Sequence, residues 1–253
     1  STAPGSLEFM DLYLDYRFLD GVQARVGQWK IPFTRFRINS FKDLTLVEWP
    51  MVTRYFGAER QLGLCLHNGY ENTRARFEYE AGVFTGVNAR ASHAIGLARM
   101  FGEPTPSPSD LVDPAPPAAV HPELVARFAF NHGSFRDLGT DTDFTRGPLR
   151  LSAGVNVAWD AAPERRRDLS LRLAPELLLK LWGVSFNGIL YVAFAQNGDG
   201  IEDQRLAFVG GLVQASYLVL DWLEASLRYA VVHSDAVMRD AARDHARDLL
   251  AAA

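Results

Sequence analysis

The chain has 253 residues, of which 48% are hydrophobic and 22% charged. General disorder is therefore excluded, and the chain is long enough to bury a sizeable core. Its 26 basic and 30 acidic side chains give a formal net charge of −4, which argues against a nucleic-acid binder. The single cysteine, Cys65, excludes a disulfide scaffold and a cysteine zinc site, and no apolar run is long enough to predict a transmembrane helix.

Apolar and polar residues alternate with the period of a β-strand along most of the chain. Most of the alternating segments are 9 to 13 residues long. Strands of soluble proteins average about 5–6 residues, whereas a tilted strand that crosses a bilayer needs about 9–11. Length therefore favours strands that span a membrane. The predicted strands cover residues 10–18, 22–27, 61–67, 73–83, 123–131, 149–159, 169–181, 184–196, 207–219 and 223–233.

The connections between these strands alternate between short and long. Short turns are predicted at Asp20-Gly21, Asn68-Gly69, Trp182-Gly183 and Leu220–Trp222, and longer polar segments at 34–59, 86–121, 160–168 and 197–205. Outer-membrane barrels have short turns at the periplasmic end and longer loops outside. The 132–147 connection is an exception, because it is too long for a minimal turn.

The two faces of the predicted sheet differ in chemistry. In lipid only a closed barrel satisfies every backbone group, so we predict an all-β, antiparallel transmembrane β-barrel with its apolar face toward lipid. Arg76 and Arg150 should then point inward, with Phe77 and Leu151 outward. The charges on the predicted lumen face are Arg17, Arg25, Arg74, Arg76, Arg127, Arg150, Arg172, Lys180 and Arg228 against Asp11, Asp15, Glu78, Glu80, Glu176 and Glu224.

This excess of cations suggests a hypothesis about selectivity. A positive lining lowers the entry barrier for anions, which predicts a mild anion preference. The alternative is that paired charges only solvate a wet interior wall.

A nine-residue segment carries a family resemblance. Val26–Thr34, with the sequence Val-Gly-Gln-Trp-Lys-Ile-Pro-Phe-Thr, resembles the Val-Gly-Gln-Phe-Lys-x-Pro-Phe-Ser signature of the phosphate-selective porin O and P family. Segments 60–63, 78–86, 212–217 and 227–229 resemble later motifs of that family in the same order. The resemblance implies a trimeric, sixteen-stranded barrel that passes phosphate or other anions, with arginines on an infolded loop at its constriction.

The chain departs from the family pattern in the loop that follows the signature. Glu48-Trp49-Pro50 stands where the family commonly has Glu-Arg-Ser, and only three lysines exist, so a lysine-lined phosphate funnel is not expected. A solvated external loop, or contact with lipopolysaccharide phosphates, is the alternative for the loop cations. The candidates for the lumen and constriction are Arg35, Arg37, Lys42, Arg54, Arg60, Arg74, Arg76, Arg127, Arg150, Arg172 and Arg228.

The chain divides into two predicted regions. Residues 7–234 form the porin-like strands and loops, and residues 235–253, rich in Ala, Arg and Asp, form a short C-terminal helix with Ser234 or Asp235 as its N-cap. About ten visible strands are fewer than sixteen. We expect either that strands are missing at both ends or that other chains close a degenerate barrel.

These observations predict an outer-membrane channel for passive diffusion of small anionic solutes, with phosphate as one candidate. The histidines are scattered without metal-ligand spacing and no Ser/His grouping has a positioned acid, so no enzyme, metal or cofactor is expected. The expected partners are outer-membrane lipid and lipopolysaccharide, small anions, and either a homotrimer or a larger envelope complex. The alternatives are a non-conducting anchor or scaffold barrel, consistent with the proline-rich 100–122 loop, and a soluble β-barrel binder.

Overall fold

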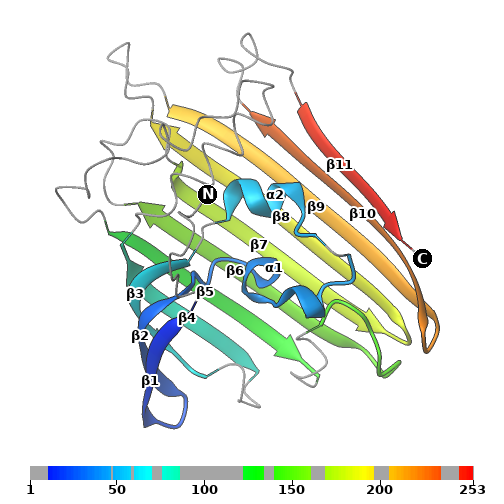
Figure 1. Cartoon of the computed structure of the whole chain (residues 1–253), viewed down its shortest axis with the longest axis horizontal. Helices are drawn as coiled ribbons and strands as arrows, with labels where there is room; N and C mark the ends of the chain where they lie inside the picture. The colour runs from blue at the N-terminus through cyan, green and yellow to red at the C-terminus, as the bar shows by residue number, and fades with distance from the viewer. Residues whose placement is uncertain are drawn as a thin grey trace, which may run out of the picture.

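In the part of the chain that the computed structural model describes, eleven β-strands form one antiparallel sheet, and each strand pairs with its neighbours in chain order (Figure 1). The structure describes residues 11–46, 48–57, 60–69, 76–85, 122–133, 140–160, 169–196, 205–234 and 245–252. The strands are β1 (Leu12–Leu19), β2 (Val22–Lys30), β3 (Arg60–His67), β4 (Phe77–Phe84), β5 (Glu123–His132), β6 (Arg150–Asp160), β7 (Leu169–Leu181), β8 (Val184–Gln196), β9 (Arg205–Leu220), β10 (Leu223–Ser234) and β11 (His245–Ala252).

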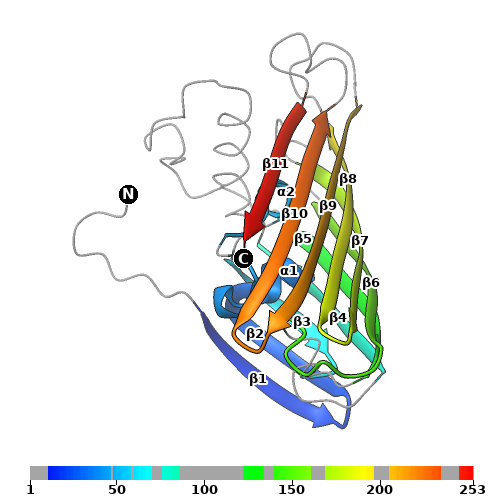
Figure 2. The same ribbon diagram turned by 90° about the vertical axis from the view of Figure 1, so that its right-hand side faces the viewer.

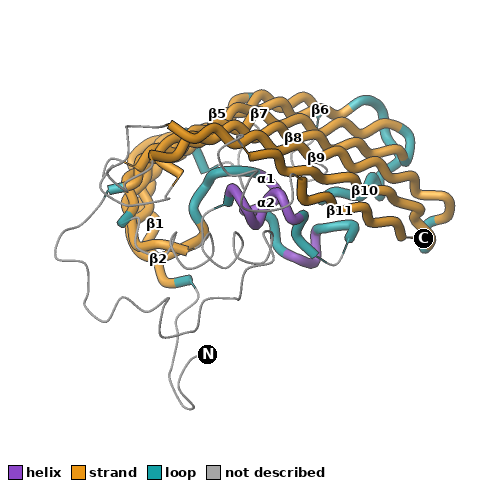
Figure 3. The backbone as a smooth tube through the Cα atoms, turned by 90° about the horizontal axis from the view of Figure 1, so that it is seen from above, coloured by secondary structure: helices purple, strands orange, loops and turns teal. Residues whose placement is uncertain are grey.

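The predicted closed barrel is not formed within the described part of the chain. There β1 pairs only with β2 and β11 only with β10, and these two strands lie at opposite ends of a curved sheet (Figures 1 and 3). Barrel diameter grows with strand number, and this sheet curves too gently for its eleven strands to meet edge to edge. The antiparallel sheet of long strands is confirmed, and closure is not.

The bounds of several strands follow directly from the alternation. β7 and β8 begin and end at the predicted residues, and the hairpin between them turns at Trp182 and Gly183. Both turn residues have positive φ, 48° and 87°, as the tight turns that match strand twist require. The register of the β7–β8 pair is therefore fixed by its two-residue connection.

The prediction of a C-terminal helix is wrong in the part of that region that the structure describes. Residues 245–252 form strand β11, which pairs with β10 from Ser226↔Ala252 to His233↔His245. The Ala-, Arg- and Leu-rich composition favours a helix locally. Pairing with β11 supplies hydrogen-bond partners for the backbone groups at the free edge of β10, and this tertiary contact overrides the local preference for a helix. Residues 235–244 lie outside the described residues.

The sheet has an apolar convex face and a polar concave face, as the alternation predicts. Val26, Leu64, Phe128, Val213 and Leu227 are among the large apolar side chains exposed on the convex face. On the concave face most charged side chains are buried. This arrangement is the reverse of a soluble barrel, which would keep apolar residues inside.

The four face assignments made from the sequence agree with the structure at three positions. Phe77 is exposed, Leu151 is half-buried on the same face, and Arg150 is buried on the concave side. Arg76 is the exception, because it lies one residue before β4 begins and is exposed there. The strand alternation therefore does not determine the direction of its side chain.

The segment between β2 and β3 folds back across the concave face (Figures 1 and 2). It contains three short helices, α1 (Arg35–Ile38), η1 (Phe41–Asp43) and α2 (Met51–Phe56). Phe33, Phe36, Val52 and Phe56 are buried in this segment and belong to the same apolar cluster as Tyr191 and other residues of the sheet. We call residues 31–57 the inner loop. Within the described residues, no helix is long and apolar enough to cross a membrane.

Candidate functional site

The inner loop is held on the sheet by an apolar joint between α2 and strands β8 and β9. The Phe56 ring stacks on Tyr191 of β8, with ring centroids 5.0 Å apart and planes 7° from parallel. The Thr53 and Tyr191 hydroxyls lie 3.2 Å apart within hydrogen-bond reach. Gly210 of β9 lies beneath this contact, and a Cβ there would be 2.6 Å from Val52 Cγ2. The missing side chain at Gly210 is what lets α2 approach the wall.

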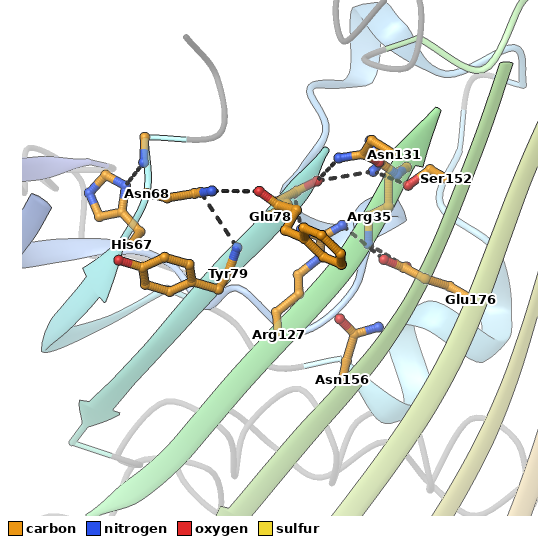
Figure 4. Close-up of polar contacts among 12 residues, drawn as sticks. Arg35, His67, Asn68, Glu78, Tyr79, Arg127, Asn131, Ser152, Asn156 and Glu176 are labelled. Carbon is orange, nitrogen blue, oxygen red and sulfur yellow. Dashed lines mark hydrogen bonds and ion pairs between the residues drawn. The ribbon is translucent and has the colours of Figure 1, made fainter. Parts of the chain in front are cut away.

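A buried ionic network joins the loop to β4, β5 and β7 (Figure 4). The Arg35 backbone N–H donates to Glu176 Oε2 at 2.8 Å, and its guanidinium lies 3.5 Å from Glu78 Oε2. Arg127 forms an ion pair with Glu78 and donates to Glu176 Oε1 at 3.0 Å. Two carboxylates therefore share two guanidinium groups, which offsets the cost of burying the four charges together.

Neutral polar groups complete the surroundings of this network. Arg35 Nη2 donates to Ser152 Oγ at 2.8 Å, and Asn131 Nδ2 donates to Glu78 Oε2 at 3.0 Å (Figure 4). These bonds satisfy oxygen and nitrogen atoms that the ion pairs leave over, as buried polar groups require. The loop is thus fixed in position on the wall at Arg35.

Arg172 and Arg228 each bind the inner loop and a wall side chain together. Arg172 of β7 forms an ion pair with Glu123 and donates to the Phe56 carbonyl at 2.9 Å. Arg228 of β10 donates to Gln214 at 2.8 Å and to the Glu48 carbonyl at 2.7 Å. Both guanidinium groups therefore hold loop carbonyls against the sheet.

Trp49 lies beside two cations of the loop and its base. The Arg37 guanidinium is 4.1 Å from the centre of the Trp49 ring and the Lys30 ammonium 5.4 Å, both within cation–π range. Lys30 also donates to the Asn39 carbonyl at 3.1 Å. Trp49 thus packs against the two cations at the position where the sequence departs from the family pattern that it resembles.

The remaining predicted cations are exposed, half-buried or outside the described residues. Lys42 and Arg54 are exposed on the inner loop, and Arg54 is 3.4 Å from Glu48. Arg60 of β3 pairs with Asp11 at 2.9 Å. Arg76 is exposed at the start of β4, and Arg74 lies outside the described residues. The structure therefore brings together Arg35, Arg37, Arg127, Arg150, Arg172 and Arg228 on the concave side.

Four acids that are buried in the described part of the chain were not predicted from the sequence: Glu123, Asp141, Asp143 and Asp160. Glu123 has the same period-2 register as Arg127, so alternation could have found it. Asp141 and Asp143 lie in a non-periodic connection that gives no such signal. Arg17, in contrast, is exposed and pairs with Asp20. Among the described residues the predicted cation excess is thereby largely offset.

The arrangement resembles a channel wall with a loop folded into it. Within the described ranges no group of three His, Cys, Asp or Glu side chains could hold a metal ion. Exposed apolar residues outside and paired charges inside are typical of outer-membrane porins. The fold and the site are therefore similar to those of that class.

Comparison with known families agrees with the class. Residues 1–99 match the model of the family described as phosphate-selective porin O and P. This partial match includes segments 26–34, 60–63 and 78–86, which carry the resemblance in the sequence, and leaves 212–217 and 227–229 outside it. Proteins of this family are non-enzymatic porins that localise to the outer membrane. No curated protein and no solved structure matches the chain significantly.

Proposed function

We propose that the chain forms the wall and the inner loop of an outer-membrane channel for passive diffusion of small anionic solutes, phosphate among them. The observation that carries this proposal is the inner loop itself, which folds onto the charged concave face and not outward onto the apolar surface (Figure 3). The loop would narrow the path behind a sheet whose convex face contacts lipid. The match of residues 1–99 to a porin family supports the same conclusion.

The anion preference would be mild. Arg35 and Arg37 place two guanidinium groups on the loop, and Arg127, Arg172 and Arg228 lie on the wall around it. Most of these cations have acidic neighbours, such as Glu78, Glu123 and Glu176, whose charges offset theirs. Fixed charges select ions by their net sign and spacing, so a nearly balanced wall discriminates weakly.

A specific observation favours a second function, that of a non-conducting anchor or scaffold. The apolar joint between α2 and the sheet buries Phe33, Val52 and Phe56 completely. A core of this kind fills part of the concave side and would resist displacement by a passing solute. In that case the barrel would serve a larger envelope assembly without transporting anything.

Single-channel recording in a planar bilayer under a salt gradient distinguishes the two functions. Discrete conductance steps with a reversal potential on the anion side would support the channel, whereas a folded, silent protein would support the scaffold. Arg35→Ala should shift the reversal potential toward cations, because it removes a guanidinium from the loop. Arg54→Ala is the matched control, since Arg54 is an exposed cation of the same loop. Cation selectivity in the unmodified protein would refute the anion proposal.

We propose that the partners are lipid, lipopolysaccharide and further protein subunits. The exposed convex face fits contact with outer-membrane lipid, and lipopolysaccharide phosphates fit exposed loop cations such as Lys42 and Arg54. The family resemblance favours a homotrimer, and the scaffold alternative favours a subunit of an envelope complex. Chemical cross-linking of the purified protein in detergent, followed by mass determination, distinguishes a trimer from a monomer.

A further inference from the structure

The connection between β5 and β6 contains a second segment that folds onto the concave side. Asp141, Thr142 and Asp143 are almost completely buried, although they lie in a non-periodic loop. This connection joins β5 to β6 at the end of the sheet that carries the short turns. The inner loop starts from the opposite end, at the end of β2. The two segments meet on the concave side.

Direct bonds join the two segments at the tip of the inner loop, residues 41–46. The Asp141 backbone N–H donates to the Asp43 carbonyl at 2.9 Å. The Thr45 and Thr142 hydroxyls lie 3.2 Å apart within hydrogen-bond reach, and the Thr45 backbone N–H donates to the Asp141 carboxylate. The tip therefore rests on residues 141–142 and not only on the sheet.

Wall side chains hold residues 140–143 in place from three strands. Lys180 of β7 donates to the Thr142 carbonyl at 2.8 Å, and the Thr142 hydroxyl donates to Glu224 of β10 at 2.8 Å. Asp143 pairs with Arg150 of β6 at 2.7 Å and accepts from the Gly183 N–H at 2.7 Å. These bonds fix the segment independently of the inner loop.

Asp141 lies at the junction of loop, segment and wall. Its carboxylate accepts from Gln214 Nε2 of β9 at 3.3 Å, and the positive charges of Arg228 and Lys180 act on it. The acids Asp43, Asp143 and Glu224 lie on the elements packed around it, and Arg150 neutralises Asp143. Burial raises the pKa of Asp141 to about 6, because the hydrogen bonds and nearby cations only partly offset the loss of hydration.

We propose that Asp141 is a positioning residue that seats the tip of the inner loop against β9, and that the seat tightens when the carboxyl group takes up a proton. This inference rests on the proposed channel function. The seated tip stabilises the loop in its narrowing position. Acidic conditions therefore favour a narrower pore with lower conductance, and neutral conditions favour a wider pore with higher conductance.

The direction and the size of the effect follow from proton linkage. With the tip seated the pKa of Asp141 is about 6, above the ordinary value of 3.8, so seating strengthens proton binding to the extent that withdrawal of the tip lets water reach the carboxyl group. Seating is therefore strongest at low pH and weakens as the pH rises through about 6. One such group changes the seated-to-unseated ratio by at most about tenfold between pH 5 and pH 7.

Single-channel recording of the full chain between pH 5 and pH 8 tests the proposal. For the unmodified protein we expect the ratio of low- to high-conductance dwell times to fall by up to about tenfold from pH 5 to pH 7. Asp141→Asn keeps an acceptor oxygen without the charge and should remove this pH dependence. Asp221→Asn is the matched control, because it removes one exposed acid from the β9–β10 turn and should leave the pH dependence intact.

Each outcome decides one of the two proposals. A conducting protein whose dwell times do not change with pH, or an Asp141→Asn variant with the full pH dependence, would overturn the role of Asp141 and leave the channel standing. A folded protein that is silent at every pH would overturn the channel function itself. Heat-modifiable migration in gels confirms that each variant is folded. Should Asp141→Asn not fold, Gln214→Leu removes the Asp141 bond from the wall side together with the bond from Arg228, and should weaken the low-conductance state at pH 5 by several-fold.

Discussion

Gly210 is the position where a single added methyl group should unseat the inner loop. Its Cβ would lie 2.6 Å from Val52 Cγ2 and closer still to Phe56 Cε2. Carbon atoms in contact normally lie about 3.5–4.0 Å apart, so α2 would have to retreat by about 1 Å. The Phe56 ring cannot simply turn aside, because it is stacked on Tyr191 and packed edge-on against Tyr55, 4.7 Å away. We therefore predict that Gly210→Ala weakens the joint.

The expected cost is that of overpacking a close-fitting core, about 1–3 kcal/mol. If this cost acts entirely on the seated loop, the unseated population rises by about 5-fold to 150-fold. Tryptic cleavage after Arg37, which is 2% exposed when the loop is seated, should then accelerate by the same factor. Conductance should also become larger or noisier, because the loop no longer keeps one position.

Gly211→Ala is the matched control, since it adds the same methyl group to the next residue on the opposite face. There the new Cβ would meet only Val231 Cγ1 at 3.9 Å, an ordinary contact. Cleavage after Arg37 should stay at the rate of the unmodified protein. Cleavage of Gly210→Ala no faster than that of the unmodified protein, or equal acceleration in both variants, would refute a role for Gly210 in seating α2. Phe56→Leu in the Gly210→Ala background should restore part of the seating.

Two further predictions concern the faces of the sheet. Leu64→Arg near the middle of β3 should lower the free energy of unfolding in a bilayer by about 2–4 kcal/mol, whereas Trp222→Arg in a turn should lower it by about 0–1 kcal/mol. Denaturant titration in lipid vesicles measures both values, and equal costs would contradict the lipid-facing assignment. Arg127→Met should cost about 3–5 kcal/mol, because it leaves Glu78 and Glu176 buried without their shared cation; a loss below 1 kcal/mol would show that the pair is not needed for stability.

The strands could be predicted from the sequence because alternation acts over long segments. In a sheet with one apolar and one polar face, a slip of one residue would reverse every side chain, so the pattern and the register reinforce each other. This is why β7 and β8 have the predicted bounds and why Phe77 and Arg150 lie on the predicted faces. The exception, β11, has a composition that favours a helix, and its strand depends on pairing with β10.

The short helices of the inner loop could not be predicted in the same way. α1 and α2 have four and six residues, too few to show a helical period. The sequence left open whether the cations of this loop face the lumen or the solvent. In the structure they divide: Arg35 and Arg37 are buried, whereas Lys42 and Arg54 are exposed. Tertiary packing of the loop, and not its charge, separates the two pairs.

The ion pairs show why the pattern of a wall does not determine its electrostatics. In the β4–β5 register Glu80 lies opposite Arg127, yet the guanidinium of Arg127 binds Glu78 and Glu176. Glu78 is also near Arg35, which comes from the inner loop and has no place in any strand register. Alternation places a charge on a face, but its partner depends on which distant segment folds onto that face. In the proposed channel, selectivity would therefore depend on the seating of the inner loop as much as on the number of arginines. Variants of Gly210 and Asp141 should then change selectivity without changing any wall charge near Arg35.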